Sequence, residues 1–339
     1  MPAEWEPHVG TWLTWPRREG ISFPDIYDRI PPIFATMIRA LSRGEGVFIN
    51  VCDSVMEKEA REILKQYNTL NNNVNFFHHP SDEPWCRDHG PIFVKNETTR
   101  AIINWDYNAW GKKYSPCDND NEIPKRIASA CGLECHTPGM VLEGGSIEVN
   151  GQGTLLTTEQ CLLHPNRNPE LDQEDLERLL REFLNVHTII WLGDGLMDDE
   201  TDGHVDNLAC FIRPGAVLAL VSSDPEDENY EVLKDNLGRL KHAKDARGRS
   251  LEIVTIEQPE ARWKDEERLA QSYINFYLPN GGVVFPSFDD PVNDEAALRT
   301  LEKVFPERRI VQLDVQEIVN GGGGIHCITQ QQPEPLESG

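Results

Sequence analysis

Short strand-like and helix-like segments alternate in a regular order along the chain, and this order is the strongest constraint on its fold. Short apolar or alternating runs predict strands, and longer amphipathic runs predict helices. The predicted strands are Val47–Val51, Pro91–Lys95, Ala101–Trp105, Ser146–Val149, Thr154–Thr157, His187–Leu192, Leu208–Ile212, Ala216–Val221, Leu251–Ile256, Tyr273–Tyr277, Gly282–Phe285 and Ile310–Leu313. The predicted helices are Ser54–Tyr67, opened by a Ser54…Glu57 capping box, Glu122–Ala130, Gln173–Leu184, Glu226–Leu240 and Asp294–Val304.

Helices recur roughly every 50 to 70 residues, with strand pairs between them, which favours repeated ββαβ-like modules over strict βαβ winding. The modules do not match in sequence, so the periodicity indicates α/β or α+β and leaves closure and symmetry open. No Pro-, Gly- or Ser-rich linker divides the 339 residues. We therefore expect one domain over residues 1–331 and a disordered tail over residues 332–339.

The formal net charge of −25 excludes nucleic acid as a partner, because the phosphate backbone requires clustered Lys and Arg. The same acidity would favour the approach of a cationic substrate. The first residues lack the basic and apolar regions of a signal peptide, and no run approaches the ~18 apolar residues of a membrane span. We expect a soluble, cytoplasmic protein with no membrane partner. The sequence leaves open whether it forms a homo-oligomer.

Eight scattered cysteines in a chain of this length fit reduced thiols in a cytosol. Cys131, Cys135 and His136 could form half of a zinc site. Their spacing is loose, and no second close Cys/His pair completes four ligands, so we expect no metal site.

Four successive glycines, Gly321–Gly324, precede Ile325, His326 and Cys327. Such a run is too costly in backbone entropy for a helix or strand interior, so it belongs where the chain turns tightly or lets a ligand approach the backbone. The residues that follow, Ile325–Thr329, predict a short buried strand. Cys327 is the best candidate for a nucleophile, although a buried structural thiol fits the pattern equally well.

Three further clusters lie between the predicted helices, where functional sites usually lie. They are Trp85–Pro91 with Asp88, Leu142–Ser146 with Glu143, and Thr201–Asn207 with His204 and Asp206. In a strand, His204 and Asp206 would point to the same face. Each cluster alone also fits a structural role, such as an ion pair or a turn.

Together these residues supply a thiol, an imidazole and three carboxylates without a metal motif or phosphate loop. That set suits a planar, cationic substrate that is attacked at carbon. A guanidinium group meets this description, because its N–H donors match carboxylates in pairs and it stays protonated at cellular pH. Two carboxylates would hold it while the thiolate attacks.

The motifs that carry these residues resemble those of agmatine deiminases, which belong to the guanidino-group-modifying enzymes together with bacterial peptidylarginine deiminases. The resemblance runs in family order from residue 4 to Gln330. It rests on Glu4-Trp5-Glu6-Pro7-His8, Thr11-Trp12, Trp15-Pro16, Trp85-Cys86-Arg87-Asp88-His89-Gly90-Pro91, Tyr107-Asn108-Ala109-Trp110-Gly111, Leu142-Glu143-Gly144-Gly145-Ser146-Ile147-Glu148, His204-Val205-Asp206 and Gly321–Cys327.

The resemblance implies the pentein fold, in which five ββαβ modules surround a pseudo-fivefold axis with the site at the centre, and it implies no cofactor. It further implies that Cys327 is the nucleophile, His204 the general acid and base, and Asp88 and Asp206 the guanidinium clamps. Glu143 would be a supporting acid. The other implied substrate contacts are Trp85, Asn108, Trp110 and Gly324.

The implied reaction is hydrolysis of agmatine to N-carbamoylputrescine and ammonia, a step of polyamine and putrescine biosynthesis. Bacterial peptidylarginine deiminases resembling this family place two arginines after the Tyr-Asn pair to bind a carboxylate. Ala109 and Gly111 occupy those positions here, which favours a substrate whose distal end carries an amine. Lys112 and Lys113 follow, however, and a lysine turned inward would favour a carboxylate instead.

Arginine or peptidylarginine deimination is therefore the alternative reaction. An amidinotransferase would use the same Cys/His/Asp set but pass the amidino group to an amine. A non-catalytic pentein that acts as a binding module would lack the complete set, whereas this chain has every member.

Overall fold

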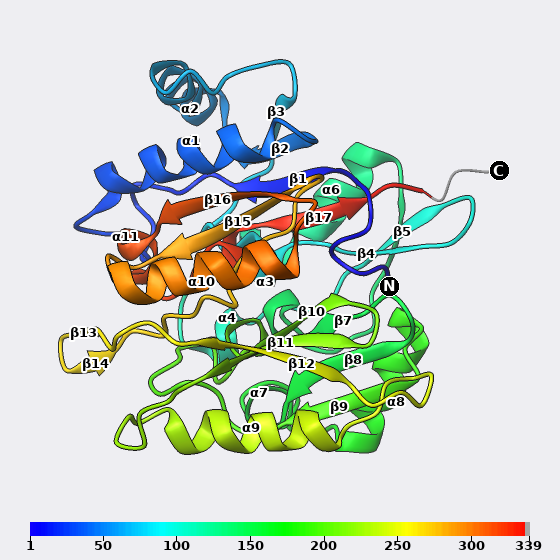
Figure 1. The fold of residues 1–339 in the computed structure, drawn as a ribbon. Helices are drawn as coiled ribbons and strands as arrows, with labels where there is room; N and C mark the ends of the chain where they lie inside the picture. The colour runs from blue at the N-terminus through cyan, green and yellow to red at the C-terminus, as the bar shows by residue number, and fades with distance from the viewer. Residues whose placement is uncertain (336–339) are drawn as a thin grey trace.

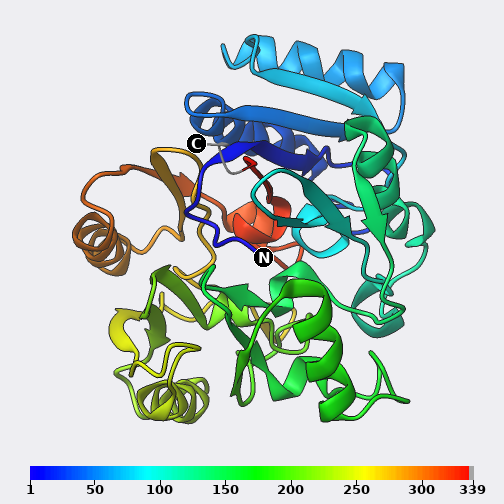
Figure 2. The same cartoon turned by 90° about the vertical axis from the view of Figure 1, so that its right-hand side faces the viewer.

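The computed structural model describes residues 1–335, which form five α/β modules around a common centre (Figures 1 and 2). In four modules two adjacent strands pair antiparallel, and a helix then leads to a third strand parallel to the second. In the remaining module, an isolated antiparallel bridge from Tyr277 to Val284 replaces the first strand. These modules confirm the predicted ββαβ repeat.

The strands of the first module are β17 (Gln330–Pro333), β1 (His8–Thr14), β2 (Gly46–Val51) and β3 (Val74–His78), with helices α1 (Ile30–Leu41) and α2 (Ser54–Gln66). The second has β4 (Ile92–Lys95), β5 (Arg100–Ile103), β6 (Glu134–His136) and α6 (Ile123–Cys131). The third has β7 (Glu148–Val149), β8 (Thr154–Thr158), β9 (Thr188–Leu192) and α8 (Gln173–Leu184). The fourth has β10 (Ala209–Arg213), β11 (Ala216–Val221), β12 (Glu252–Glu257) and α9 (Tyr230–His242), and the fifth has β15 (Gly282–Ser287), β16 (Arg309–Asp314) and α10 (Pro291–Val304).

Short elements connect the modules. A hairpin, β13 (Trp263–Lys264) and β14 (Glu267–Arg268), lies apart from the five sheets. The short helices are α3 (Cys86–His89), α4 (Ala109–Lys112), α5 (Asp118–Asn121), α7 (Glu159–Leu162) and α11 (Gln316–Val319), and the 3-10 turns are η1 (Tyr27–Arg29), η2 (Gly144–Ser146), η3 (Val205–Asn207) and η4 (His326–Ile328).

The two ends of the chain close the ring. The last strand, β17, pairs antiparallel with the first, β1, in a register that sets Trp12 opposite Gln330. Figure 2 shows the long helices on the periphery and the orange-red C-terminal segment at the centre. Strand β17 includes two residues, Gln332 and Pro333, that the sequence pattern assigned to the tail. Residues 336–339 of that tail lie outside the described residues.

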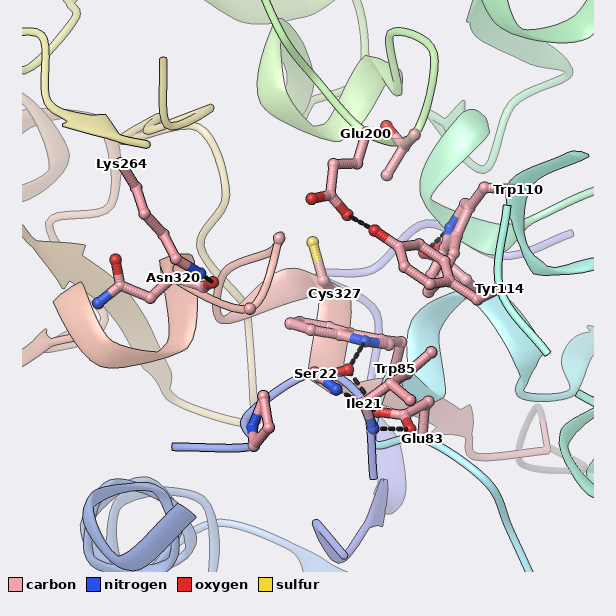
Figure 3. Close-up of a pocket in the computed structure, with 15 residues that line it drawn as sticks. Ile21, Ser22, Glu83, Trp85, Trp110, Tyr114, Glu200, Lys264, Asn320 and Cys327 are labelled. Carbon is pink, nitrogen blue, oxygen red and sulfur yellow. Dashed lines mark hydrogen bonds between the residues drawn. The ribbon is translucent and has the colours of Figure 1, made fainter. Parts of the chain in front are cut away.

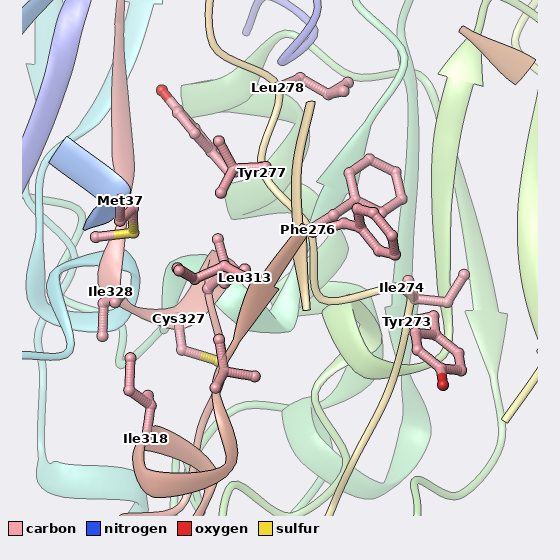
Figure 4. Packing of buried hydrophobic residues seen from close by; sticks show 14 of the residues in the cluster. Met37, Tyr273, Ile274, Phe276, Tyr277, Leu278, Leu313, Ile318, Cys327 and Ile328 are labelled. Carbon is pink, nitrogen blue, oxygen red and sulfur yellow. The ribbon is translucent and has the colours of Figure 1, made fainter. Parts of the chain in front are cut away.

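The largest cluster of buried apolar side chains surrounds this centre and includes Cys327 together with Met37, Leu313, Ile318 and Ile328 (Figure 4). Close packing therefore fixes the backbone from which Cys327 projects. Within residues 1–335, no helix is both long and apolar enough to cross a membrane.

Several local predictions were wrong. Residues 273–277 form no strand, because the segment turns so that Asn275 bonds the backbone of His326. The N-cap of α2 is Asp53, whose carboxylate accepts from Val55 and Met56, and not the predicted Ser54. The sequence pattern also missed several elements, namely α1, β1, β3, β6 and β17.

Candidate active site

A cavity of about 160 Å³ opens at the centre of the modules, and Cys327 lies on its wall (Figure 3). Trp85, Asp88 and Trp110 line the same cavity, together with Tyr114 and Glu200 farther along the wall. In Figure 3 the sulfur of Cys327 points into the space between these side chains. Residues from four of the predicted clusters thus reach one cavity or its immediate surroundings.

Cys327 lies on the 3-10 turn η4 and not on the predicted strand Ile325–Thr329. The glycines before it allow this turn to pack closely. A Cβ atom on Gly323 would lie 2.5 Å from the Trp85 ring, and one on Gly324 would lie 2.4 Å from Asn275 Oδ1. Only glycine fits at either position.

The Cys327 sulfur is almost fully buried and has polar neighbours. Asn275 Nδ2 lies 3.2 Å from Cys327 Sγ, and Asp206 Oδ2 lies 3.8 Å from it. Burial, followed by the charges of Asp206 and Asp88, raises the pKa of the Cys327 thiol well above its usual value. Without a cation in the cavity, the thiol therefore keeps its proton.

Asp88 lies on α3 with both carboxylate oxygens directed by hydrogen bonds. Trp110 Nε1 donates to Asp88 Oδ2 over 3.0 Å, and the backbone N–H of Gly145 donates to Asp88 Oδ1 over 3.0 Å. Burial raises the pKa of Asp88 to about 6; His204 opposes this effect and Asp206 reinforces it.

Gly145 brings three of the predicted clusters together. A Cβ atom at this position would lie 2.6 Å from His204 Nδ1, 2.8 Å from Asp88 Oδ1 and 3.0 Å from Asp206 Oδ2. The second glycine after Glu143 therefore marks a close approach of three functional side chains, and not only a turn.

His204 immediately precedes η3, so the predicted strand placement of His204 and Asp206 was wrong. The two residues still reach the same site, because the tight turn replaces the alternation of a strand. His204 Nδ1 lies 3.7 Å from Asp88 Oδ1, and His204 Nε2 lies 3.8 Å from Glu143 Oε2. Burial alone would lower the pKa of His204, but Asp88 and Cys161 beside the ring raise it well above its usual value.

Glu143 lies behind His204 and forms a buried ion pair with Arg167. Arg167 Nε lies 2.8 Å from Glu143 Oε1. Burial would raise the pKa of Glu143, but Arg167 and His204 hold it below its usual value. Glu143 is therefore a carboxylate that stabilises a protonated His204.

Asp206 is oriented by His326 and is not among the described residues that line the cavity. Its Oδ2 atom lies 2.8 Å from His326 Nδ1, while Oδ1 has no hydrogen-bond partner among the described residues. A buried carboxylate oxygen without a partner is costly. Oδ2 is the oxygen that faces Cys327, 3.8 Å from its sulfur.

Only some of the remaining predicted substrate contacts line the cavity. Trp85 and Trp110 line the cavity, whereas its described lining does not include Asn108 or Gly324. Asn108 caps α4, accepting a bond from the N–H of Gly111 and donating to the carbonyl of Asn166. Gly324 lies beside Asn275 and acts through the packing of the turn.

Sequence reasoning missed four neighbours of these residues, namely Asn275, His326, Arg167 and Cys161. His326 could have been suspected from its place beside Cys327. The others lie in segments whose patterns predicted ordinary strands or loops, so no local signal identified them.

One group of side chains carries the atom types that bind metals. The ligand atoms of Glu143, Cys161 and His204 lie within 4.8 Å of one another. The raised pKa of His204 makes its ring an imidazolium, which has no lone pair for a metal ion, and Glu143 is already paired with Arg167. We therefore interpret this group as the surroundings of His204.

The outer part of the cavity carries more acid than base. Glu83 and Glu200 line it, together with Lys264, whose ammonium donates to the carbonyl of Asn320 over 2.8 Å. Glu83 accepts the N–H groups of Ile21 and Ser22, while Glu200 accepts the Tyr114 hydroxyl.

The two lysines after Gly111 do not line the cavity among the described residues. Lys113 Nζ donates to Asp202 Oδ1 over 2.6 Å and to the carbonyl of Glu200. Lys112 is exposed. The inward lysine that would favour a carboxylate substrate is therefore not found at Lys112 or Lys113.

Comparisons with known proteins agree with this geometry. A model of the Porphyromonas-type peptidyl-arginine deiminase family matches residues 1–333. A putative agmatine deiminase of Legionella pneumophila strain Paris is 41% identical, over 100% of this chain and 96% of its own length. The agmatine deiminase of Ectopseudomonas mendocina is 42% identical, over 99% of this chain and 95% of its own.

The solved structure of Enterococcus faecalis agmatine deiminase has a TM-score of 0.92 and 34% identity, covering 99% of this chain and 96% of that one. This agreement over the full length confirms the predicted pentein fold.

Proposed function

We propose that this chain, which belongs to the Porphyromonas-type peptidyl-arginine deiminase family, hydrolyses agmatine to N-carbamoylputrescine and ammonia. The observation that carries this conclusion is the meeting of a buried thiol, an imidazole and three carboxylates in and around one cavity, with Cys327 and Asp88 on its wall. The names of the relatives support the same substrate. The roles given below to individual residues are part of the proposal.

Asp88 and Asp206 would hold the guanidinium group. One oxygen of each carboxylate lies within 3.0 Å of the same point, the position of a Cβ on Gly145, so the two charges face one small volume. A guanidinium offers N–H donors on two edges of a plane, which suits two carboxylates of this kind.

Substrate binding would also prepare the nucleophile. The carboxylates of Asp206 and Asp88 contribute to the raised pKa of Cys327. A guanidinium between them compensates their charge and adds a positive charge beside the sulfur, which favours loss of the thiol proton to solvent. The thiolate then attacks the guanidino carbon and forms a C–S bond.

His204 would transfer the protons of both half-reactions. Its raised pKa makes it an imidazolium, which protonates the departing nitrogen as the C–N bond breaks and ammonia leaves. The cationic amidino-thioether that remains is still held by Asp88 and Asp206. His204, now neutral, takes a proton from water, and the resulting hydroxide attacks the same carbon. The C–S bond breaks, the thiolate is restored, and a proton lost to solvent leaves the neutral ureido product.

The distal end of the cavity favours an ammonium group over a carboxylate. Glu83 and Glu200 are part of the cavity wall, and Lys113 is engaged by Asp202 outside the described lining. Arginine would place its carboxylate near these acids, with Lys264 as the lining cation. We therefore expect kcat/KM for agmatine to exceed that for arginine by at least ~10³.

An ammonia-release assay against agmatine, arginine and a peptide with C-terminal arginine tests this preference. Lys113→Ala and Lys112→Ala should leave the ratio of agmatine to arginine unchanged. Comparable wild-type rates on agmatine and arginine, with selective loss of arginine turnover in either lysine variant, would replace agmatine by an arginine-type substrate. Transfer of a labelled amidino group to an amine acceptor, in place of ureido product, would indicate an amidinotransferase.

We further propose that the reaction serves putrescine formation in the cytoplasm, because N-carbamoylputrescine needs only loss of its carbamoyl group to give putrescine. The charge of −25 supports small cationic substrates over nucleic acid. Free cysteines, including exposed Cys135, fit a reducing compartment.

A further inference from the structure

His326, the residue before the proposed nucleophile, lies between two buried carboxylates. Its Nδ1 atom lies 2.8 Å from Asp206 Oδ2, and its Nε2 atom lies 3.0 Å from Glu4 Oε2. All three side chains are less than a tenth exposed. The reaction described above uses Asp206 but assigns nothing to His326 or Glu4.

This geometry determines the charge of the ring. A neutral imidazole has one N–H, so it can donate to only one of two ionised carboxylates, and its other nitrogen would face an oxygen lone pair. Only the imidazolium donates to both. Burial and the Arg87 guanidinium would lower the pKa of His326, but Glu4 and Asp206 raise it to about 9.

Glu4 is firmly held in turn. Arg87 Nη2 lies 3.1 Å from Glu4 Oε2, and the N–H of Leu278 donates to Glu4 Oε1 over 2.9 Å. Burial would raise the pKa of Glu4, but His326 and Arg87 lower it to about 2. A row of alternating charges therefore runs from beside Cys327 into the protein: Asp206, His326, Glu4 and Arg87.

Two other titratable groups face the same buried region. Glu148 on β7 and Cys210 on β10 line a small internal cavity with Glu4, Asp206 and His326. Burial, followed by the charge of Glu4, raises the pKa of Glu148 to about 8. Burial and the charge of Glu148 raise the pKa of Cys210 well above its usual value. Near neutral pH, Glu148 and Cys210 are therefore mostly uncharged, and Glu4 is the anion at the Nε2 side of the His326 ring.

We propose that His326 is a positioning residue: as an imidazolium held by Glu4, it fixes the Asp206 carboxylate through Oδ2, beside Cys327, where the guanidinium would bind. The inference rests on the proposed function, because it assigns Asp206 to the substrate. It makes the N-terminal segment part of the active site, since Glu4 supplies the charge that keeps His326 protonated.

Glu4→Gln is the decisive variant. The amide has the shape of the carboxylate, and its nitrogen can donate to Nε2 of a neutral ring, which keeps its own Nδ1–H for Asp206. The contact with His326 therefore remains without the charge of Glu4, whereas the bond that Glu4 Oε2 accepts from Arg87 is lost. In the variant, the decline of kcat/KM for agmatine on the alkaline side should begin at least one pH unit lower than in the wild type. At pH 6.5, where His326 still gains a proton readily, kcat/KM should stay within about threefold of the wild type.

Glu6→Gln is the matched control. Glu6 lies in the same N-terminal segment, but its carboxylate pairs with Lys95 at 2.9 Å and accepts from the N–H of Ala3. This variant should show the wild-type pH profile. Equal profiles for Glu4→Gln and the wild type, or equal shifts in Glu4→Gln and Glu6→Gln, would overturn the proposal.

His326→Gln keeps one donor for Asp206 without the charge. Its KM for agmatine should rise at least ~10-fold, more than its kcat falls, because a hydrogen bond to a charged group is lost from substrate binding. An unchanged KM would count against the positioning role.

Nitrogen-15 NMR of histidine side chains tests the charge state without substrate. The His326 signals, identified by their absence in His326→Gln, should show both ring nitrogens protonated at pH 7.5 in the wild type and should titrate at lower pH in Glu4→Gln. A neutral wild-type ring at pH 7.5 would refute the proposal even if the variants fold poorly. Failure of the wild type to act on agmatine would instead refute the proposed function and leave the NMR result intact.

Discussion

Arg167 Nε lies 2.8 Å from Glu143 Oε1, and neither side chain is exposed to solvent. The same guanidinium donates to Asp202 Oδ2 and to the carbonyl of Thr201. Arg167 therefore joins the segment that precedes His204 to the carboxylate behind its ring. This ion pair fixes the position of the proposed acid and base and compensates a charge that could not otherwise remain buried.

Arg167→Met should lower the free energy of unfolding at pH 7 by about 3–5 kcal/mol, because it leaves Glu143 as a buried charge without its partner. The folded-state pKa of Glu143 lies below its usual value, so the contribution of the pair is present above the unfolded pKa and lost as pH falls through the folded one. Urea unfolding at pH 7 and at a series of pH values below 4.5 should therefore show a difference from the wild type that shrinks as the pH falls.

Arg178→Met is the control for this measurement. Arg178 pairs with Asp175 at 2.9 Å, but both side chains are exposed, so the change should stay within about 0.5 kcal/mol. A similarly small effect for Arg167→Met would show that Glu143 does not need its partner.

Cys327→Ala should abolish turnover of agmatine and leave the protein folded, because the thiol forms the proposed covalent intermediate. Cys327→Ser should also be nearly inactive, since a hydroxyl is much harder to ionise. Mass spectrometry of acid-quenched wild-type enzyme should find an amidino adduct on the peptide that contains Cys327. Cys135→Ala removes an exposed thiol and should keep full activity. Full activity in Cys327→Ala would remove the assignment.

Asp88→Asn and Asp206→Asn should each reduce kcat/KM by at least ~100-fold, or nearly 3 kcal/mol, because each variant removes half of the anionic clamp. Thermal unfolding should change far less than activity. Asp194→Asn, at an exposed position on the segment before His204, should have little effect on either. Losses below tenfold at both clamp positions would mean that the guanidinium is held elsewhere.

The pH profile of kcat/KM should report the ionisation of Asp88 in the free enzyme. The pKa of Asp88 is raised to about 6, so kcat/KM should fall as pH decreases through about 6 and the carboxylate gains a proton. Trp110→Phe removes the indole N–H that donates to Asp88 and lowers its pKa. The acid side of the profile should therefore move to higher pH in this variant. A shift to lower pH would contradict the role given to the Trp110 bond.

Local patterns predicted the regular elements best where packing and capping agree. The sequence pattern predicted the observed bounds of α8, Gln173–Leu184, because its amphipathic run has a local signal at each end. Asp172 caps the N-terminus, and Asn185 ends the helix in the left-handed conformation. The pattern missed α1, which begins with two prolines after Ile30 and has no side-chain cap. Proline in the first turn is compatible with a helix, but it resembles a loop signal when read alone.

The candidate site was also predicted only in part: its residue types were predicted, but the backbone conformation around them was not. The residue types of Cys327, His204, Asp88 and Asp206 by themselves indicated a guanidino substrate, because thiol, imidazole and paired carboxylates suit few other groups. The backbone around them was predicted as strand, whereas Cys327 lies on a 3-10 turn and His204 immediately precedes another. β-branched and apolar residues favour strands only when a partner strand is available. No partner strand pairs with these segments among the described residues, and close packing around the glycines stabilises the turns instead.

The sequence by itself determined the chemistry of this protein and the modular alternation of its fold, because residue type and short-range periodicity are local properties. Only the tertiary structure decided the charge states and orientations on which that chemistry depends. The two carboxylates that hold His326 come from Glu4 and Asp206, which are 322 and 120 residues away along the chain. Closure of the ring by β1 and β17 helps bring these groups together, and no local pattern encodes a contact made at that distance.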